Sequence, residues 1–383
     1  MLSIPETIRE QLPAVQNQIY LNTGTCGPQP RSSLDAMRAA LECDVAEGRI
    51  SAASSNRHHQ LREGLRALLA EIVGAPQESV CLTHNTGEGI NIILAGMRWR
   101  EGDEVITTDS EHISLTAPLA NLQQRFGIRV TAVASSEIER VPALIAKHLT
   151  ERTRLVAISH VSWMTGAVFP VDEIVAVAHR QDVPVLVDAA QSAGAMRLHL
   201  GQSGADYCAM AGQKWFCGPE GMGALYIRPS LWRLLENSWA GYMSGRMGDA
   251  NEGFVPHDAA KRFEVGAQNA ADFAGLQESL RWQRDEIGLD WIAERTYTVA
   301  EQMRLLLKEI VALRVITTEQ HAGLVVFSQD RWSPQELTAR LADRRIIIRS
   351  IPKTPYCRVS TGFYTSDGDL EETARAIAEL TKH

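Results

Sequence analysis

Between residues 80 and 227 the chain alternates short apolar runs with segments of helical periodicity, and this alternation constrains its fold most. The apolar runs predict strands at 80–83, 104–108, 130–133, 155–158 and 183–187. The segments between them have the periodicity of helices, at 88–97, 115–126, 142–149 and 171–180. Alternation of this kind predicts an α/β fold with a mainly parallel sheet covered by helices on both faces.

After residue 270 the pattern changes. A long helical stretch from 270 to about 312 precedes three short strands, predicted at 323–328, 346–349 and 358–361. Two further helices are predicted beside them, at 334–343 and 367–381. We therefore predict three parts: an N-terminal arm (1–20), a large domain (21–270) and a small C-terminal α+β domain (271–383).

Composition narrows the class of protein. The chain has 383 residues, is 45% hydrophobic and carries a net charge of -8, which suits a metabolic enzyme and argues against a nucleic-acid partner. No apolar run approaches the length of a membrane span, and the N-terminus shows no signal peptide. The six cysteines have no metal-ligand spacing and indicate reduced thiols. We expect a cytoplasmic protein without a metal site or membrane association.

Lys214 indicates the chemistry. It lies between two strand-like runs, 207–210 and 224–227, and is surrounded by glycines, which let backbone approach a flat ligand closely. Asp188 ends the preceding buried strand. A lysine can hold the aldehyde of pyridoxal phosphate as a Schiff base, and an aspartate can keep its pyridine nitrogen protonated. The pair therefore predicts pyridoxal phosphate as cofactor.

Polar residues that follow the other strands are candidates to line the same site, because ligands of open α/β sheets collect at the carboxyl ends of strands. Thr86 and Gly87 open a helix and could bind a phosphate, or they could only cap the helix. His112 could stack on the cofactor ring or be an ordinary loop residue. Gln191 could donate to the phenolic oxygen of the ring or simply begin a helix.

From about Tyr20 to its C-terminus the chain resembles the class V aminotransferase and cysteine desulfurase group of fold-type I pyridoxal phosphate enzymes. Several short motifs carry the resemblance: Tyr20-Leu-Asn-Thr-Gly24, Thr86-Gly87, Glu111-His112, Asp188-Ala-Ala-Gln191, Lys214 with Gly218-Pro219, and Arg358-Val-Ser360. The resemblance implies a homodimer with shared active sites. The segment 241–248 could reach the partner's site, or it could be a surface loop.

The resemblance also implies a role for each matching residue. Lys214, Asp188 and His112 would be catalytic, with Lys214 bound covalently to the cofactor. Gln191 would contact the phenolate oxygen, and Thr86, Gly87 and Gln213 would hold the phosphate. The substrate would be bound by Arg358, whose planar fork suits a carboxylate, together with Asn22 and Thr25. As an alternative, Arg358 could be an exposed strand arginine.

Three departures from the family pattern concern the cofactor shell. Ala211 and Ala267 stand where the family has hydroxyl residues that reach the phosphate, and Ser162-Trp163-Met164 stands where it has an asparagine near the ring. Each neutral hydrogen bond contributes about 1 kcal/mol net, so the lost hydroxyls predict modest cofactor affinity unless Gln268, Asn269 or another group compensates.

The reaction follows from the cysteine pattern and from two motifs. Cysteine desulfurases use a mobile-loop cysteine, whereas Cys357 adjoins Arg358 in a predicted strand. The segments 160–166 and 214–219 look most similar to the cystine/cysteine C–S lyase branch, with isopenicillin N epimerase-like proteins second. The resemblance implies an external aldimine, a Cα carbanion and loss of a β-sulfur group. Transamination, epimerisation and a catalytically idle regulator or binding protein remain alternatives.

Overall fold

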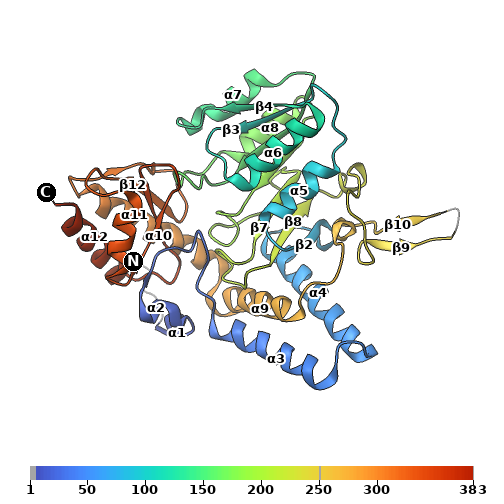
Figure 1. Cartoon of the computed structure of the whole chain (residues 1–383), viewed down its shortest axis with the longest axis horizontal. Coiled ribbons are helices and arrows are strands. Elements are labelled where there is room, and N and C mark those ends of the chain that lie inside the picture. The colour runs from blue at the N-terminus through green and yellow to red at the C-terminus, as the bar shows by residue number, and fades with distance from the viewer. Residues whose placement is uncertain (1–5, 250–251, 383) are drawn as a thin grey trace.

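The computed structural model describes residues 6–249 and 252–382, which form a large seven-stranded sheet and a small four-stranded sheet (Figure 1). The large sheet has the order β2-β8-β7-β6-β5-β3-β4. Its strands are β2 (Val80–Thr83), β3 (Glu104–Thr108), β4 (Arg129–Val133), β5 (Thr153–Ser159), β6 (Val185–Asp188), β7 (Tyr207–Ala211) and β8 (Gly223–Ile227). All pairs are parallel except the two that β8 makes. The prediction of a mainly parallel sheet is confirmed.

Helices cover both faces of this sheet, because neighbouring strand residues point to opposite sides. On one face α5 (Thr86–Gly96) and α6 (Ile113–Phe126) pack against buried strand residues such as Val105 and Leu155. On the other face Ile106 and Val156 belong to a second apolar cluster. The helices that contribute to it include α4 (Ala52–Ile72), α7 (Val141–His148), α8 (Val171–His179) and α9 (Ala270–Arg281).

Two helices of the large domain start earlier than periodicity predicted, and both starts lie at the carboxyl edge of the sheet. The Asn85 side chain accepts a hydrogen bond from the Glu88 amide, so α5 begins at Thr86 instead of 88. The His112 side chain accepts from the Ser114 amide, so α6 begins at Ile113. Side-chain caps of this kind satisfy amides that the first helical turn leaves free.

The long helical stretch predicted from 270 to about 312 is divided. It consists of α9 (Ala270–Arg281), a π-helical turn (Trp282–Ile287) and α10 (Leu289–Lys308). α9 packs against α3 (Arg31–Glu47) and α4, two helices that the sequence analysis did not predict. α10 instead packs against elements of the small sheet.

The small sheet has the order β11-β12-β15-β14 and is antiparallel. Its strands are β11 (Arg314–Val315), β12 (Leu324–Ser328), β14 (Arg349–Ser350) and β15 (Tyr356–Ser360), and its helices α10, α11 (Pro334–Ala342) and α12 (Asp367–Thr381). The single strand predicted at 346–349 is wrong, because β13 (Ile346–Ile347) leaves this sheet to pair with β1 (Ile19–Tyr20).

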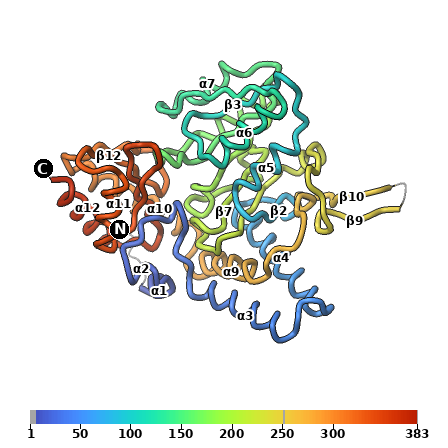
Figure 2. The backbone as a smooth tube through the Cα atoms, in the orientation of Figure 1, coloured from blue at the N-terminus to red at the C-terminus, as the bar shows by residue number. Residues whose placement is uncertain are grey.

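The N-terminal segment lies beside the small sheet (Figure 2). It contains α1 (Glu6–Glu10), α2 (Pro13–Asn17) and β1. Ile8, Leu12 and Val15 are buried in an apolar cluster with Phe363 and Tyr364, which follow β15. The first part of the chain therefore packs against the last.

Part of the segment 241–248 forms β9 (Gly245–Met247), which pairs with β10 (Phe254–Pro256). This hairpin projects from the body of the protein (Figure 1). Residues 250 and 251 lie outside the described residues. Among the helices that the structure describes, none is long and apolar enough to span a membrane.

Candidate active site

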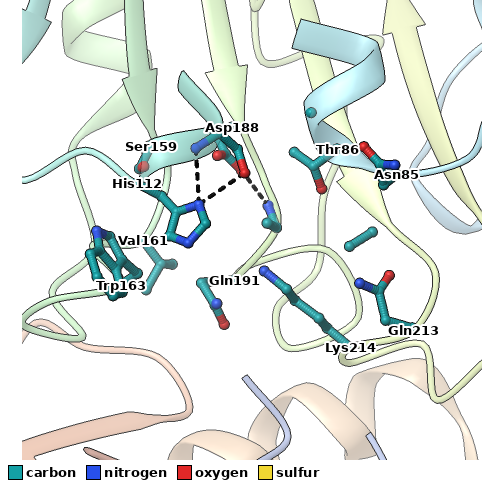
Figure 3. A pocket seen from close by; sticks show the side chains of 14 residues that line it. Asn85, Thr86, His112, Ser159, Val161, Trp163, Asp188, Gln191, Gln213 and Lys214 are labelled. Atoms are coloured by element: carbon teal, nitrogen blue, oxygen red, sulfur yellow. Dashed lines mark hydrogen bonds between the residues drawn. The ribbon is translucent and has the colours of Figure 1, made fainter. Parts of the chain in front are cut away.

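A cavity of about 200 Å³ opens where β5 and β6 end and α5 begins (Figure 3). All seven residues predicted to bind the cofactor line it: Thr86, Gly87, His112, Asp188, Gln191, Gln213 and Lys214. Its walls also include Ser159, Val161 and Trp163. The fold thus gathers side chains from the ends of five strands (β2, β3, β5, β6 and β7) into one site.

Lys214 follows β7 and points its amine toward the space between Gln191, His112 and Asp188 (Figure 3). Burial lowers the pKa of this amine to about 8, against the opposing influence of the Asp188 carboxylate. The positive charges of Arg358 and Arg349 contribute to this lowering. A large fraction of Lys214 is therefore neutral, and able to act as a base or nucleophile, near pH 8.

This low pKa predicts how the reactivity of Lys214 depends on pH in the cofactor-free protein. We expect the rate of Lys214 acetylation by dilute acetic anhydride to rise with pH with a midpoint near pH 8, because only the neutral amine reacts. Mass spectrometry of the modified peptide measures the rate, and the exposed Lys147 serves as internal reference. A midpoint near the usual pKa of 10.5 would contradict the buried, cation-flanked environment.

Asp188 ends β6 and is 5% exposed. Burial raises the pKa of its carboxyl group, while the Lys214 charge and a hydrogen bond from the Ala190 amide (2.9 Å) oppose the rise. No lysine or arginine of the described residues lies within ion-pair distance of this carboxylate. A buried carboxylate that faces a cavity, with no described lysine or arginine at ion-pair distance, suits a protonated ring nitrogen as its partner.

The opposite end of the cavity suits a phosphate. Thr86 and Gly87 are the first residues of α5, where backbone amides are free and the helix dipole attracts an anion. The Thr86 hydroxyl is buried and has no hydrogen-bond partner, and the same holds for the Gln213 side-chain oxygen. Since an amide can be turned by half a rotation, Gln213 can present its NH₂ group to an anion. These unsatisfied groups fit the phosphate of pyridoxal phosphate.

His112 is held in place at the part of the cavity that would receive the cofactor ring. The Ser114 amide donates to His112 Nδ1 (3.2 Å), and the imidazole meets the Trp163 ring edge to face at 4.9 Å. Burial lowers the pKa of His112 to about 4, and the charges of Lys214, Arg349 and Arg358 add to this effect. The neutral imidazole can therefore pack against a flat ring without bringing a charge.

Gln191 is fixed by two hydrogen bonds. Its Nε2 donates to the Gly24 carbonyl (2.9 Å), and its Oε1 accepts from the Trp215 indole (3.0 Å). An amide nitrogen has two hydrogens, so one remains for a ligand. The predicted contact with the phenolate oxygen is compatible with this geometry.

Arg358 is 1% exposed in β15 and donates only weakly, to the Trp163 carbonyl (3.3 Å) and the Thr25 hydroxyl (3.4 Å). Arg349 lies directly opposite in β14 and donates to the same hydroxyl (2.8 Å). Burial lowers the pKa of Arg358 to about 9, and the Arg349 charge contributes. No carboxylate of the described residues pairs with either guanidinium. The alternative of an exposed strand arginine is wrong for Arg358.

The described lining of the cavity does not include the three residues predicted to bind the substrate, Asn22, Thr25 and Arg358. Arg358 adjoins the cavity through its hydrogen bond to Trp163, which is part of the lining. The Asn22 side chain accepts from the Thr25 hydroxyl (2.7 Å), which in turn accepts from both arginines. These two residues therefore support the arginines. Their role in substrate binding stays a prediction. Arg349 was missed by the sequence analysis, because only the register of β14 against β15 places it opposite Arg358.

A model of the class-V aminotransferase family matches residues 19–372. The chain belongs to the class-V aminotransferase family. Among curated relatives, it is 31% identical to a probable cysteine desulfurase of Methanothermobacter thermautotrophicus, with 98% of each chain covered. It is 26% identical to the isopenicillin N epimerase of Streptomyces clavuligerus, with 95% of each covered. The resemblance stated from the motifs is thereby confirmed.

Two solved structures are similar over nearly the whole chain. The cystine C–S lyase C-DES, in complex with its reaction product cysteine persulfide, matches with a TM-score of 0.93 and 30% identity, covering 96% of this chain and 99% of that one. A lysine-to-alanine mutant of C-DES, with glycine covalently linked to its pyridoxal phosphate, matches equally well, with coverage of 97% and 99%. This class-V chain thus has the fold type I of pyridoxal phosphate enzymes.

Proposed function

We propose that this chain is a pyridoxal phosphate-dependent C–S lyase that cleaves cystine or a related S-substituted cysteine. The observation that carries the proposal is the pair Arg349 and Arg358, two neighbouring guanidinium groups without a described carboxylate partner. Arg358 is buried and Arg349 half-buried, so leaving these two cations unpaired side by side is costly unless a ligand supplies the anions. Cystine carries two carboxylates, one for each arginine.

The residues of the cavity and the adjoining Arg358 have separate roles in the proposed reaction. Pyridoxal phosphate, when bound, supplies an electron-withdrawing ring that stabilises negative charge at the substrate Cα. Arg358 binds the α-carboxylate, and Lys214 in its neutral form takes the proton from Cα. Asp188 keeps a proton on the ring nitrogen. The C–S bond then breaks with its electron pair on sulfur, and water hydrolyses the released aminoacrylate to pyruvate and ammonia.

The cysteine next to the arginines supports a lyase rather than a desulfurase. Cys357 is 1% exposed within β15, and its side chain packs into the apolar core of the small domain. It faces away from Arg358, because adjacent strand residues alternate. A thiol in this position does not swing into the cavity to take a sulfur atom from the substrate. With cystine, the sulfur leaves as cysteine persulfide instead.

We also propose that the enzyme is a homodimer. Several large apolar side chains are exposed near the projecting hairpin, among them Trp239, Tyr242 and Met247. Ile113, at the start of α6, is likewise 67% exposed, beside a shallow hollow that adjoins Gly87 at the phosphate end of the cavity. A two-fold arrangement that covers these side chains would place the partner chain next to the proposed phosphate site.

The test compares two disulfide substrates, each of which loses a persulfide when its C–S bond breaks. L-cystine has a distal carboxylate, and the mixed disulfide of cysteine with cysteamine lacks it. We expect Arg349→Gln to lower kcat/KM for pyruvate release from cystine by roughly 10- to 100-fold while sparing the mixed disulfide, because a hydrogen bond between charged groups contributes about 1.5–3 kcal/mol. Arg358→Gln should impair both substrates.

Equal losses on both substrates for Arg349→Gln would refute the assignment of the distal carboxylate. A yellow protein that releases no pyruvate would refute the lyase. Consumption of a keto acid, or racemisation of the substrate, would then identify transamination or epimerisation. Protein that captures no pyridoxal phosphate would favour an idle regulator or binding protein.

A further inference from the structure

The loop that carries Lys214 connects β7 to β8, and it is held by side chains of α9 and of the π-helical turn that follows α9. The Phe216 carbonyl, two residues after Lys214, accepts hydrogen bonds from the Ser279 hydroxyl (2.7 Å) and from Gln283 Nε2 (2.8 Å). Ser279 and Gln283 are 0% and 1% exposed. Because these two residues are four positions apart, they lie on the same face of the helix, and both donate to the same oxygen.

The loop requires such an anchor. The Cys217 amide donates to the Lys214 carbonyl (3.0 Å), which closes a tight turn, and Cys217 has a φ of 52°. A non-glycine residue in this left-handed conformation costs on the order of 1 kcal/mol, so it persists only where its surroundings hold it. Gly27 packs so closely on the Lys214 carbonyl that a side chain at position 27 would overlap it.

Gln283 lies in the π-helical turn between α9 and α10, where the Gly288 amide bonds back to the Gln283 carbonyl (2.9 Å). α9 packs on the large domain and α10 on the small sheet, so the turn lies between the two. Single π-helical turns often mark functional positions in helices. Here the turn places a side-chain amide against the lysine loop.

An apolar cluster makes a second connection. Cys217 and Trp282 are buried together with Phe363 and Tyr364, which follow the strand of Arg358. The Trp282 and Phe363 rings lie 5.9 Å apart. The lysine loop, the π-helical turn and the end of the arginine strand therefore share one packed core. Such a core transmits a displacement of one part to the others.

We infer that Ser279 and Gln283 are positioning residues: by holding the Phe216 carbonyl they aim Lys214 into the cavity and tie the lysine loop to the small domain. This inference rests on the proposed role of Lys214. If the small domain moves when a substrate binds its arginines, the same helix moves the lysine loop, so substrate capture and the position of the base are coupled.

The test uses Gln283→Met, which keeps the side-chain length and removes the donor, and Ser279→Ala. Acetylation of Lys214 against pH in the cofactor-free protein reports the environment of its amine. We expect the Lys214 pKa to rise by at least about half a unit in either variant, since the amine leaves its buried site. We also expect a roughly tenfold lower kcat, with KM little changed. Ser279→Thr keeps the hydroxyl, so the Lys214 pKa and kcat of this variant should equal those of the unaltered protein.

Ser33→Ala is the matched control, because Ser33 is also fully buried and donates one hydrogen bond to a backbone carbonyl, that of Gly275 in α9. It should lower the melting temperature as Ser279→Ala does and leave the Lys214 pKa and kcat unchanged. If Lys214 captures pyridoxal phosphate and its pKa is the same in all variants, the positioning role is refuted. If pyridoxal phosphate is not captured on Lys214 even in the unaltered protein, the proposed function fails instead.

Discussion

Lys214→Ala is expected to lower pyruvate release from L-cystine by at least about 10³-fold. Removing a general base typically costs 10²–10⁴-fold, and this variant also loses the amine that can bind the cofactor covalently. The folded structure should survive, because alanine occupies less space at the cavity wall and removes a group whose burial disfavours its charge. Steady-state assays of the purified, cofactor-supplemented protein measure the loss.

Lys147→Ala serves as control for this variant, since Lys147 is an exposed lysine of α7 far from the cavity in sequence and fold. It should match the unaltered enzyme. A Lys214→Ala protein with near-normal turnover would remove Lys214 from the mechanism. Borohydride reduction of the unaltered holoenzyme, followed by mass spectrometry, should place the cofactor on Lys214 and on no other lysine.

Asp188→Asn is expected to lower kcat on the order of 10²-fold while the cofactor stays bound. An asparagine at this position still packs at the end of β6, but its neutral amide does not hold a positive ring nitrogen as a carboxylate does. The interaction that this variant loses, between the Asp188 carboxylate and the ring nitrogen, stabilises negative charge at Cα. The effect should therefore fall on kcat more than on KM. Absorbance of the bound cofactor confirms occupancy before rates are compared.

Asp109→Asn is the matched control, because Asp109 follows β3 as Asp188 ends β6 but is exposed. Its carboxylate accepts hydrogen bonds from the amide and the hydroxyl of Ser135, and Asp109 is not among the described residues that line the cavity. Full activity in Asp188→Asn would show that the carboxylate does not act on the ring nitrogen. Equal losses in both variants would point to a general effect of strand-end aspartates on folding.

The strands and the lysine–aspartate pair were predictable because each depends on local pattern. The central strands of the large sheet are mostly apolar and buried, so their positions are clear from composition, and the ends of parallel strands converge on one edge. The residues predicted from those strand ends do line one cavity. Their distances and hydrogen bonds required the structure.

Three features escaped prediction for physical reasons. α3 has only one buried residue, Ser33, so it lacks the apolar stripe by which a helix is predicted. Arg349 became a site residue only when the register of β14 and β15 placed it opposite Arg358. The π-helical turn at Trp282–Ile287 brings Gln283 to the Phe216 carbonyl, 67 residues away in the chain, and no local pattern reports such a contact.

The pairing of β1 with β13 has a consequence for how the protein is made. Ile19 leaves the ribosome 327 residues (346 − 19) before Ile346, so β1 waits for its partner strand while the intervening chain is made. Closing so long a loop is slow and comes late in folding. Thr25 follows the arm and lies under both arginines only after this step. A nascent chain can thus build the cofactor cavity before β13 is made, but it completes its substrate-binding end only after the strands from β13 to β15 have been synthesised.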